Sequence, residues 1–388
     1  MRVLAACSLG GAGHLQPLRP ILDAARRAGH DTLLIGPPAL TDLAADTGHP
    51  FAPGAEPPEA EVDAIRERLP VVPAGEASVL ANRELFGRLA TRAMLPAMVR
   101  VVETWQPDLV VRDPCEYSSA VVAHRTGHRI AQVAIGLAAA EWGSIEVAAP
   151  ALEKHRPGLT DAVRATPYVT RFPASLDPSP FASTRRFREH PAIVHRPRGG
   201  PPTGTGSGRP LVYVSFGTVL GHMSIAAEAY RTVLDAVAGI DARVLLSVGR
   251  RFEPSRLGAV PGNVRIEPWF DQRDVLAEAE LVVCHGGSGT TFGALAAGVP
   301  VVIVPLFADQ FANAATVVDA GAGLAVEAGN EVDGGRRRLR PGDAARIAGA
   351  IETVRGDRSF RDAARRIGDE MAGAPAVGEL VADLLGRS

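Results

Sequence analysis

The residues best suited to chemistry lie in the segment 269–310, which reads WFDQRDVLAEAELVVCHGGSGTTFGALAAGVPVVIVPLFADQ. The apolar run at 281–284 predicts a strand covered on both faces, and HGGSGTT follows it directly. Glycines between a strand and a helix N-terminus let backbone N–H groups approach an anion. Ser288 and Thr290 add hydroxyl donors, and His285 stands at the strand end. This pattern predicts a diphosphate-binding loop.

The residue pattern excludes several diphosphate-binding classes. The lysine-bearing P-loop pattern is absent, and the one lysine of the chain, Lys154, has no glycine loop before it. The first glycine turn, SLGGAGHLQP, lacks the third glycine of the dinucleotide fingerprint, because Gln16 stands there. No Asp-x-Asp pair offers a carboxylate pair to a metal on a nucleotide-sugar. We therefore expect neither a P-loop kinase nor a nicotinamide enzyme, and no metal.

The segment 269–310 resembles the donor-binding signature of the GT-B glycosyltransferases that act on small-molecule acceptors. GHLQP at 13–17 and VSFGT at 214–218 also match, so the resemblance covers nearly the whole chain. HGGSGTT and GALAAGVP are more similar to the bacterial antibiotic branch than to the plant pattern. The resemblance implies two Rossmann-like doubly wound parallel-sheet domains facing across a cleft, with the acceptor in the first domain and the donor in the second.

The resemblance also implies the donor-binding residues. Trp269 and Phe270 would lie at the nucleobase, His285 at the diphosphate, and Asp309 with Gln310 at the transferred sugar. The other donor-binding candidates are Ser215, Thr218, Gly287, Ser288, Gly289 and Thr290. Alternatives remain open: a core position for Trp269, a helix cap for Asp309, and an ordinary turn after the strand that ends near 215.

One departure from the plant pattern bears on the donor. Plant relatives carry a glutamate for the ribose hydroxyls eight positions after the signature histidine, and that position here is Gly293. The loss of this carboxylate matters less when the 2′-hydroxyl is missing, as in thymidine nucleotides. Members of the bacterial branch mostly use TDP-deoxysugars. We expect no cofactor, and a TDP-sugar in preference to a UDP-sugar as co-substrate.

The catalytic candidates are His14 and Asp113. His14 follows the first strand and a glycine turn, ahead of a helix expected to begin near Pro17; a helix N-terminus disfavours the imidazolium. In the resembling transferases the histidine of this motif deprotonates the acceptor hydroxyl, and an aspartate balances its charge. A satisfied turn histidine is one alternative. A helix cap made by Asp113, Pro114 and Glu116 is the other.

The elements that position these residues repeat along the chain. The segments 2–36 and 210–249 each read as strand, glycine turn, helix and strand, which predicts two doubly wound sheets with ligands at the carboxyl ends of their strands. We expect an N-terminal domain at 1–195, a Pro- and Gly-rich linker at 196–209, a C-terminal domain at 210–372, and a final helix in 373–388 that packs back on the first domain.

The composition agrees with this organisation. A length of 388 residues suits about two domains, and a net charge of −2 gives no reason to expect nucleic acid. The longest apolar run, 294–307, is broken by glycine and prolines, so no membrane span is expected. The cysteines predict reduced core thiols in the cytoplasm, and they are Cys7, Cys115 and Cys284. A basic run predicts a solvated loop and comprises Arg336, Arg337, Arg338 and Arg340.

Together these features predict an inverting, metal-independent glycosyltransferase that moves a sugar, expected to be a deoxysugar, from a TDP-sugar to a natural-product aglycone. The segments 52–105 and 136–190 are expected to form much of the acceptor pocket, although their aromatic and Met side chains are more typical of core. A nucleotide-sugar 2-epimerase, a lipid-linked precursor transferase and a non-catalytic nucleotide-binding helper remain alternatives. The atom glycosylated and a homodimeric state stay open.

Overall fold

A computed structural model describes residues 1–9, 11–69, 71–189, 209–217, 220–223, 225–250, 252–327, 329–332 and 336–386. The chain divides into two compact units. The first unit contains residues 1–190 and 374–388, and the second contains residues 191–373. Among the described helices, none is long and apolar enough to cross a membrane.

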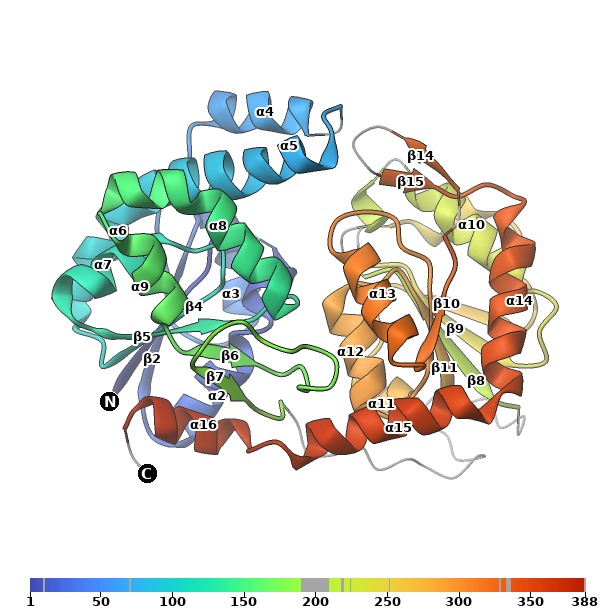
Figure 1. The fold of residues 1–388 in the computed structure, drawn as a ribbon. Coiled ribbons are helices and arrows are strands. Elements are labelled where there is room, and N and C mark those ends of the chain that lie inside the picture. The colour runs from blue at the N-terminus through green and yellow to red at the C-terminus, as the bar shows by residue number, and fades with distance from the viewer. Residues whose placement is uncertain are drawn as a thin grey trace. The chain divides into compact units, whose positions relative to one another are not determined.

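The first unit is built on a seven-stranded parallel sheet with the order β3-β2-β1-β4-β5-β6-β7 (Figure 1). Its strands are β1 (Arg2–Ala6), β2 (Asp31–Gly36), β3 (Phe51–Pro53), β4 (Leu109–Arg112), β5 (Arg129–Val133), β6 (Tyr168–Thr170) and β7 (Thr184–Arg186). The strand order reverses between β1 and β4. In open α/β sheets such a reversal leaves a crevice at the carboxyl ends of the two strands.

Helices cover both faces of this sheet. The helices are α1 (Ala12–Leu15), α2 (Arg19–Arg27), α3 (Thr41–Ala45), α4 (Glu59–Arg68), α5 (Ala74–Ser78), α6 (Thr91–Trp105), α7 (Ser118–Thr126), α8 (Ala138–His155), α9 (Leu159–Ala165) and α16 (Val377–Leu384), with 3-10 turn η1 (Pro38–Leu40) and π-helix η2 (Val79–Ala90). Alternate residues of β1, Val3 and Ala5, pack with Ile21 of α2 and Leu380 of α16 in one apolar cluster. Helix α16 lies against α2, so the end of the chain completes the first unit's core.

The second unit repeats the plan with a six-stranded parallel sheet, order β10-β9-β8-β11-β12-β13. Its strands are β8 (Leu211–Ser215), β9 (Arg243–Ser247), β10 (Val264–Glu267), β11 (Ala279–Cys284), β12 (Val301–Ile303) and β13 (Gly323–Ala325). The order reverses between β8 and β11. The prediction of two doubly wound parallel sheets is therefore confirmed.

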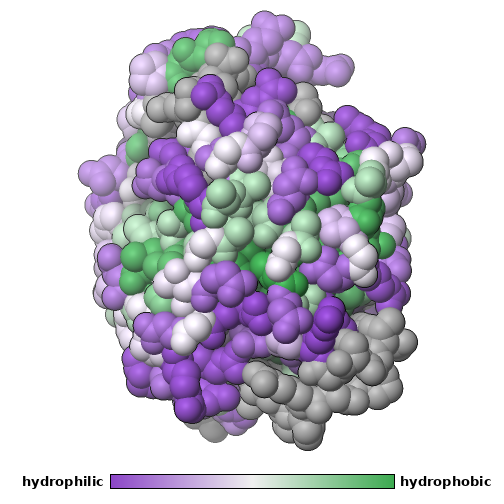
Figure 2. Space-filling view, turned by 90° about the vertical axis from the view of Figure 1, so that its right-hand side faces the viewer, coloured by the Kyte–Doolittle hydropathy of each residue, from purple (hydrophilic) through white to green (hydrophobic). Residues whose placement is uncertain are grey.

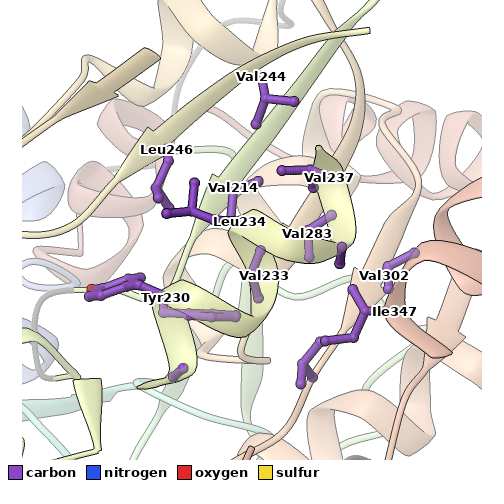
Figure 3. Packing of buried hydrophobic residues seen from close by; sticks show 14 of the residues in the cluster. Val214, Tyr230, Val233, Leu234, Val237, Val244, Leu246, Val283, Val302 and Ile347 are labelled. Atoms are coloured by element: carbon purple, nitrogen blue, oxygen red, sulfur yellow. The ribbon is translucent and has the colours of Figure 1, made fainter. Parts of the chain in front are cut away.

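The helices of the second unit also lie on both sides of its sheet (Figure 1). They are α10 (Ala226–Val237), α11 (Gln272–Leu276), α12 (Ser288–Ala296), α13 (Gln310–Asp319), α14 (Asp343–Gly356) and α15 (Arg358–Gly373), with short 3-10 turns η3 (Leu220–His222) and η4 (Pro254–Leu257). Figure 3 shows Val214 and Val283 of the sheet packing with Tyr230 of α10 and Ile347 of α14. Figure 2 shows hydrophilic residues around a central hydrophobic area on the side where Figure 1 draws α14.

The basic run departs from the solvated loop that the sequence predicts. Strands β14 (Asn330–Val332) and β15 (Arg336–Arg338) pair antiparallel as a small hairpin. The guanidinium of Arg337 lies 5.3 Å from the ring centre of Phe311 and pairs with Glu327 at 3.3 Å. Positions 196–208 of the expected linker lie outside the described residues.

Candidate functional site

The strand-order reversal of the first sheet brings His14 and Asp113 together. Ala6, the last residue of β1, pairs in register with Arg112, the last residue of β4. The residues that follow these two strands therefore emerge side by side at the carboxyl edge of the sheet. Asp113 follows β4 immediately, while Ser8 and then His14 follow β1.

The contacts among these side chains are short and directional. Nδ1 of His14 lies 3.2 Å from Oδ1 of Asp113. The Ser8 hydroxyl donates to the same Oδ1 at 3.0 Å and lies 3.2 Å from Nδ1 of His14. The backbone N–H of Ser8 donates to Oδ2 at 2.6 Å, and that of Cys115 donates to Oδ1 at 2.8 Å. The carboxylate is thus held in one orientation from several directions.

The electrostatics of the dyad favour an ionised carboxylate beside the imidazole. The side chain of Asp113 is fully buried, whereas that of His14 is 17% exposed. Burial by itself raises the pKa of Asp113, but the charge and hydrogen bond of His14 and the N–H groups of Ser8 and Cys115 hold this pKa below its ordinary value. The arrangement can orient the imidazole and stabilise its protonated form, as a general base requires.

Two details differ from the sequence-based prediction. His14 already lies inside a short helix, the four-residue α1, and the next helix, α2, begins at Arg19, two residues after Pro17. The helix after β4 begins at Ser118, and the carboxylate of Glu116 accepts hydrogen bonds from the first N–H groups there. The capping role therefore belongs to Glu116, which leaves Asp113 to contact His14.

Ser8 and Arg112 are functional candidates that the sequence analysis missed. Arg112 is fully buried, and its guanidinium donates to the backbone carbonyls of Asp113, Pro114 and Glu116. It thereby fixes the turn that carries the carboxylate. Their positions in the sequence could have indicated these roles. Ser8 lies just after the first predicted strand, and Arg112 immediately precedes the predicted aspartate.

The aromatic and Met side chains expected at the acceptor pocket are mostly buried. The ring of Phe86 lies 6.1 Å from that of His14, and the side chain of Phe86 is 9% exposed. Met94, Met98 and Phe181 are buried as well. A cavity of about 450 Å³ within the first unit is lined by residues of α4, α5 and η2, with His14 and Phe86 outside its lining. The structure thus places one aromatic ring of these segments beside the dyad.

The second sheet repeats the geometry at its own reversal point. Ser215, which ends β8, pairs in register with Cys284, which ends β11, and His285 follows. A Cβ built on Gly217 would lie 2.9 Å from Cε1 of His285, and one on Gly287 would lie 2.5 Å from its Nε2. The imidazole therefore lies against two glycines, and a side chain at either position would force the ring to shift.

The ring of His285 is neutral but incompletely hydrogen-bonded. Burial lowers its pKa to about 4, although a hydrogen bond with the Ser215 backbone acts to raise this pKa. Its Nδ1 is buried and has no hydrogen-bond partner among the described residues. A buried ring nitrogen without a partner is costly unless a ligand supplies one. Helix α12 begins at Ser288, immediately after Gly287, so N–H groups at its N-terminus lie in the same loop.

Asp309 is held close to this loop by a residue that the sequence analysis missed. Asn313, which is fully buried, donates from Nδ2 to the Gly286 carbonyl at 2.8 Å and to Asp309 Oδ2 at 3.2 Å. The Ser288 hydroxyl also donates to Asp309 Oδ2, at 3.3 Å. Asp309 occupies the N-cap position of α13 but makes no side-chain capping bond. The sequence could have indicated this role, because Asn313 stands four positions after Asp309.

Gln310 is less available to a ligand than its motif indicates. Its Oε1 accepts hydrogen bonds from the backbone N–H groups of Leu306 and Phe307, at 2.8 and 3.1 Å. A ligand would therefore contact Gln310 through its amide nitrogen. The preceding residue, Ala308, has a positive φ of 57°, so the turn that carries Asp309 and Gln310 is strained.

The base-binding candidates are partly exposed. Trp269 is 56% exposed, so its alternative as a core residue is wrong, and the guanidinium of Arg250 lies 5.7 Å from its ring centre. Phe270 packs edge-on against Tyr213 at 6.5 Å. Gly289 and Thr290 lie in the first turn of α12, whereas Thr218 lies outside the described residues.

Comparison with known proteins assigns the chain to a family. The family described as erythromycin biosynthesis protein CIII-like matches with its N-terminal domain over residues 23–182 and with its C-terminal domain over residues 231–386. The L-demethylnoviosyl transferase of Streptomyces niveus is 31% identical, and the match spans 97% of this chain and 95% of that protein. The elloramycin glycosyltransferase ElmGT of Streptomyces olivaceus is 30% identical, over 99% of this chain and 97% of its own.

Solved structures agree on the fold. The glycosyltransferase SnogD from Streptomyces nogalater superposes with a TM-score of 0.75 at 24% identity, covering 100% of this chain and 99% of its own. The spinosyn rhamnosyltransferase SpnG complexed with thymidine diphosphate gives a TM-score of 0.78 at 24% identity, with 99% and 100% covered. The chain therefore belongs to the erythromycin biosynthesis protein CIII-like family of antibiotic glycosyltransferases, and it is a GT-B enzyme that transfers a sugar to a natural-product acceptor.

Proposed function

We propose that this glycosyltransferase moves a deoxysugar from a TDP-sugar to a hydroxyl group of an apolar natural-product aglycone, with inversion at the anomeric carbon and without a metal ion. The observation that carries the proposal is the buried Asp113 carboxylate 3.2 Å from the partly exposed His14. A general base for a hydroxyl needs such a partner, because the proton it accepts must be balanced by a nearby negative charge.

The acceptor step follows from which nitrogen of His14 is engaged. Nδ1 faces Asp113 and Ser8, so Nε2 is the nitrogen that takes the acceptor proton. As that proton leaves, the acceptor oxygen forms a bond to the anomeric carbon, and the bond from this carbon to the diphosphate oxygen breaks. Attack from the face opposite the leaving group inverts the configuration. Asp113 then stabilises the imidazolium without itself taking the proton.

The leaving diphosphate is stabilised by the second unit. The N-terminus of α12 offers N–H groups, and the unpaired Nδ1 of His285 lies in the same buried loop. The negative charge of the diphosphate offsets the burial that lowers the pKa of His285, so donor binding favours an N–H at Nδ1. Preorganised donors of this kind are worth about 3–4 kcal/mol each in the transition state. These groups replace the charge that a metal would otherwise supply.

The choice of thymidine is supported by the surroundings of Gly293. A Cβ at this position would lie 3.5 Å from Oε1 of Gln272, so the space that a ribose-binding glutamate would enter is bordered by an uncharged amide. SpnG and the glycosyltransferase SsfS6 from Streptomyces sp. SF2575 have been crystallised with thymidine diphosphate. A TDP-sugar lacks the 2′-hydroxyl and needs no carboxylate there.

Calorimetric titration with TDP and UDP, each with and without EDTA, tests the donor. We expect TDP to bind more tightly than UDP and EDTA to have no effect. Gly293→Glu should narrow or reverse the preference, because it restores a carboxylate acceptor for the 2′-hydroxyl. Tighter binding of UDP by the unmodified protein, or loss of TDP binding in EDTA, would contradict the proposal.

Variants of the dyad test the reaction with TDP-rhamnose and a panel of aromatic polyketide and macrolactone aglycones. His14→Ala should abolish transfer and leave TDP binding unchanged. Asp113→Asn should lower the rate of transfer and likewise leave TDP binding unchanged. A product formed from TDP-rhamnose without any aglycone would support the 2-epimerase alternative instead. Loss of TDP binding in His14→Ala would contradict the assignment of roles to the two units.

A further inference from the structure

Three side chains of different chemistry converge at the carboxyl edge of the first sheet. One ligand atom each from His14, Asp113 and Cys115 lies within 4.8 Å of the other two. They come from α1 and from the turn after β4, so the same strand-order reversal that forms the dyad also brings in the thiol. Cys115 is the only partly exposed cysteine of the three, since Cys7 and Cys284 are buried.

The spacing of the first two ligands suits a tetrahedral metal ion. Zn²⁺ binds imidazole nitrogen and carboxylate oxygen at about 2.0–2.2 Å, so tetrahedral coordination places two such ligands roughly 3.3–3.6 Å apart. Nδ1 of His14 and Oδ1 of Asp113 lie 3.2 Å apart. The Zn–S bond is about 2.3 Å, and the sulfur of Cys115 lies within 4.8 Å of both of these atoms.

The carboxylate is also oriented in the way that metal ligands usually are. The Cys115 N–H and the Ser8 hydroxyl both donate to Oδ1 of Asp113, and the Ser8 N–H donates to Oδ2. Such outer hydrogen bonds hold a ligand in place before the metal arrives. Nitrogen, oxygen and sulfur together select zinc or cadmium over Mg²⁺ or Ca²⁺, which prefer oxygen ligands.

We propose that His14, Asp113 and Cys115 form an inhibitory site for Zn²⁺ and similar thiophilic divalent cations. Binding forms bonds from the metal to Nδ1 of His14, Oδ1 of Asp113 and Sγ of Cys115. It releases the thiol proton to solvent, moves the Nδ1 proton of His14 to Nε2, and displaces the Ser8 hydroxyl from Oδ1. No electrons are transferred. The inhibitory consequence rests on the proposed function, because a metal at Nδ1 breaks the His14–Asp113 contact and removes the imidazole as a base.

The metal-binding part is tested without any activity assay. Titration of the full-length protein with Cd²⁺ should produce an ultraviolet thiolate-to-cadmium charge-transfer band at a stoichiometry of one. Cys115→Ala should lose this band, while Cys284→Ala, which removes a buried thiol of the second unit, should keep it. A band of unchanged intensity in Cys115→Ala would overturn the site, as would its loss in Cys284→Ala.

The inhibitory part is tested by transfer assays with added Zn²⁺. We expect Zn²⁺ to inhibit the unmodified enzyme, EDTA to reverse the inhibition, and Mg²⁺ to have no effect. With inhibition expressed relative to each protein's own activity without added metal, the Zn²⁺ concentration for half-inhibition should rise by about tenfold or more in Cys115→Ala. Equal sensitivity of both proteins to Zn²⁺ would overturn the proposal. If no aglycone is glycosylated, the proposed function fails while the Cd²⁺ titration still decides the site.

Discussion

Replacing Gly287 by alanine tests whether the position of His285 controls donor binding. Gly287 has φ −64° and ψ 137°, which alanine adopts without strain, so the backbone itself tolerates the change. The new Cβ would lie 2.5 Å from Nε2 of His285 and 2.7 Å from its Cε1. Ordinary van der Waals contact begins at 3.4 Å, so the ring must retreat by about 0.9 Å.

The ring has little room for this retreat. Gly217 lies against it as well, where a Cβ would come within 2.9 Å of Cε1. Overpacking of this kind costs about 1–3 kcal/mol, which in a unit of this size lowers the unfolding midpoint by roughly 2–4 °C per kcal/mol. Displacing the imidazole removes a hydrogen bond to a charged ligand, worth about 1.5–3 kcal/mol, and so weakens TDP binding by about 10- to 150-fold.

Calorimetry of unfolding and of TDP binding measures both effects. Gly289→Ala is the matched stability control. Gly289 lies two residues after Gly287 in the first turn of helix α12, its Cβ would meet nothing within 4 Å, and alanine should leave the unfolding midpoint unchanged or raise it. In a His285→Ala background, Gly287→Ala should have little further effect on TDP affinity. An equal loss of affinity in both backgrounds would refute a mechanism acting through the imidazole.

Three further predictions concern single side chains. Ser8→Ala should lower kcat by about 10- to 100-fold at unchanged TDP affinity in steady-state assays and calorimetry, because it removes a hydrogen bond to the Asp113 carboxylate; an unchanged kcat would rule out this positioning role. Asn313→Ala should cost about 1–3 kcal/mol of stability in urea unfolding, since it leaves the buried Gly286 carbonyl without its donor, and it should raise the KM for the donor sugar, since it frees Asp309; wild-type values of both would contradict the prediction. Burial raises the pKa of Glu141 to about 8 from an ordinary 4.5, so the folded state holds this proton more tightly. The contribution of Glu141 to stability is therefore fully present below pH 4.5 and is lost as pH rises through about 8. Glu141→Gln should flatten that decline in urea unfolding at several pH values, and an identical slope in both proteins would show that another group causes it.

Much of the donor loop was predictable because its signals are local. The apolar run before His285 predicted strand β11, and the glycines that follow it predicted the start of helix α12. The same local pattern did not reveal that the side-chain oxygen of Gln310 is bonded to the backbone of Leu306 and Phe307. The sequence shows which polar side chains are present near a turn, but it does not show which of them form hydrogen bonds to the backbone of that turn.

The sequence alone determined the two parallel sheets, the glycine loop and the family, since apolar runs and loop glycines are properties of consecutive residues. Only the tertiary structure decided how the candidate residues meet. Ser8 and Asp113 are 105 residues apart, and they touch because β1 and β4 become neighbours where the strand order reverses. Strand order depends on how helices pack across both faces of a sheet, which is a sum of long-range contacts that no short stretch of sequence contains.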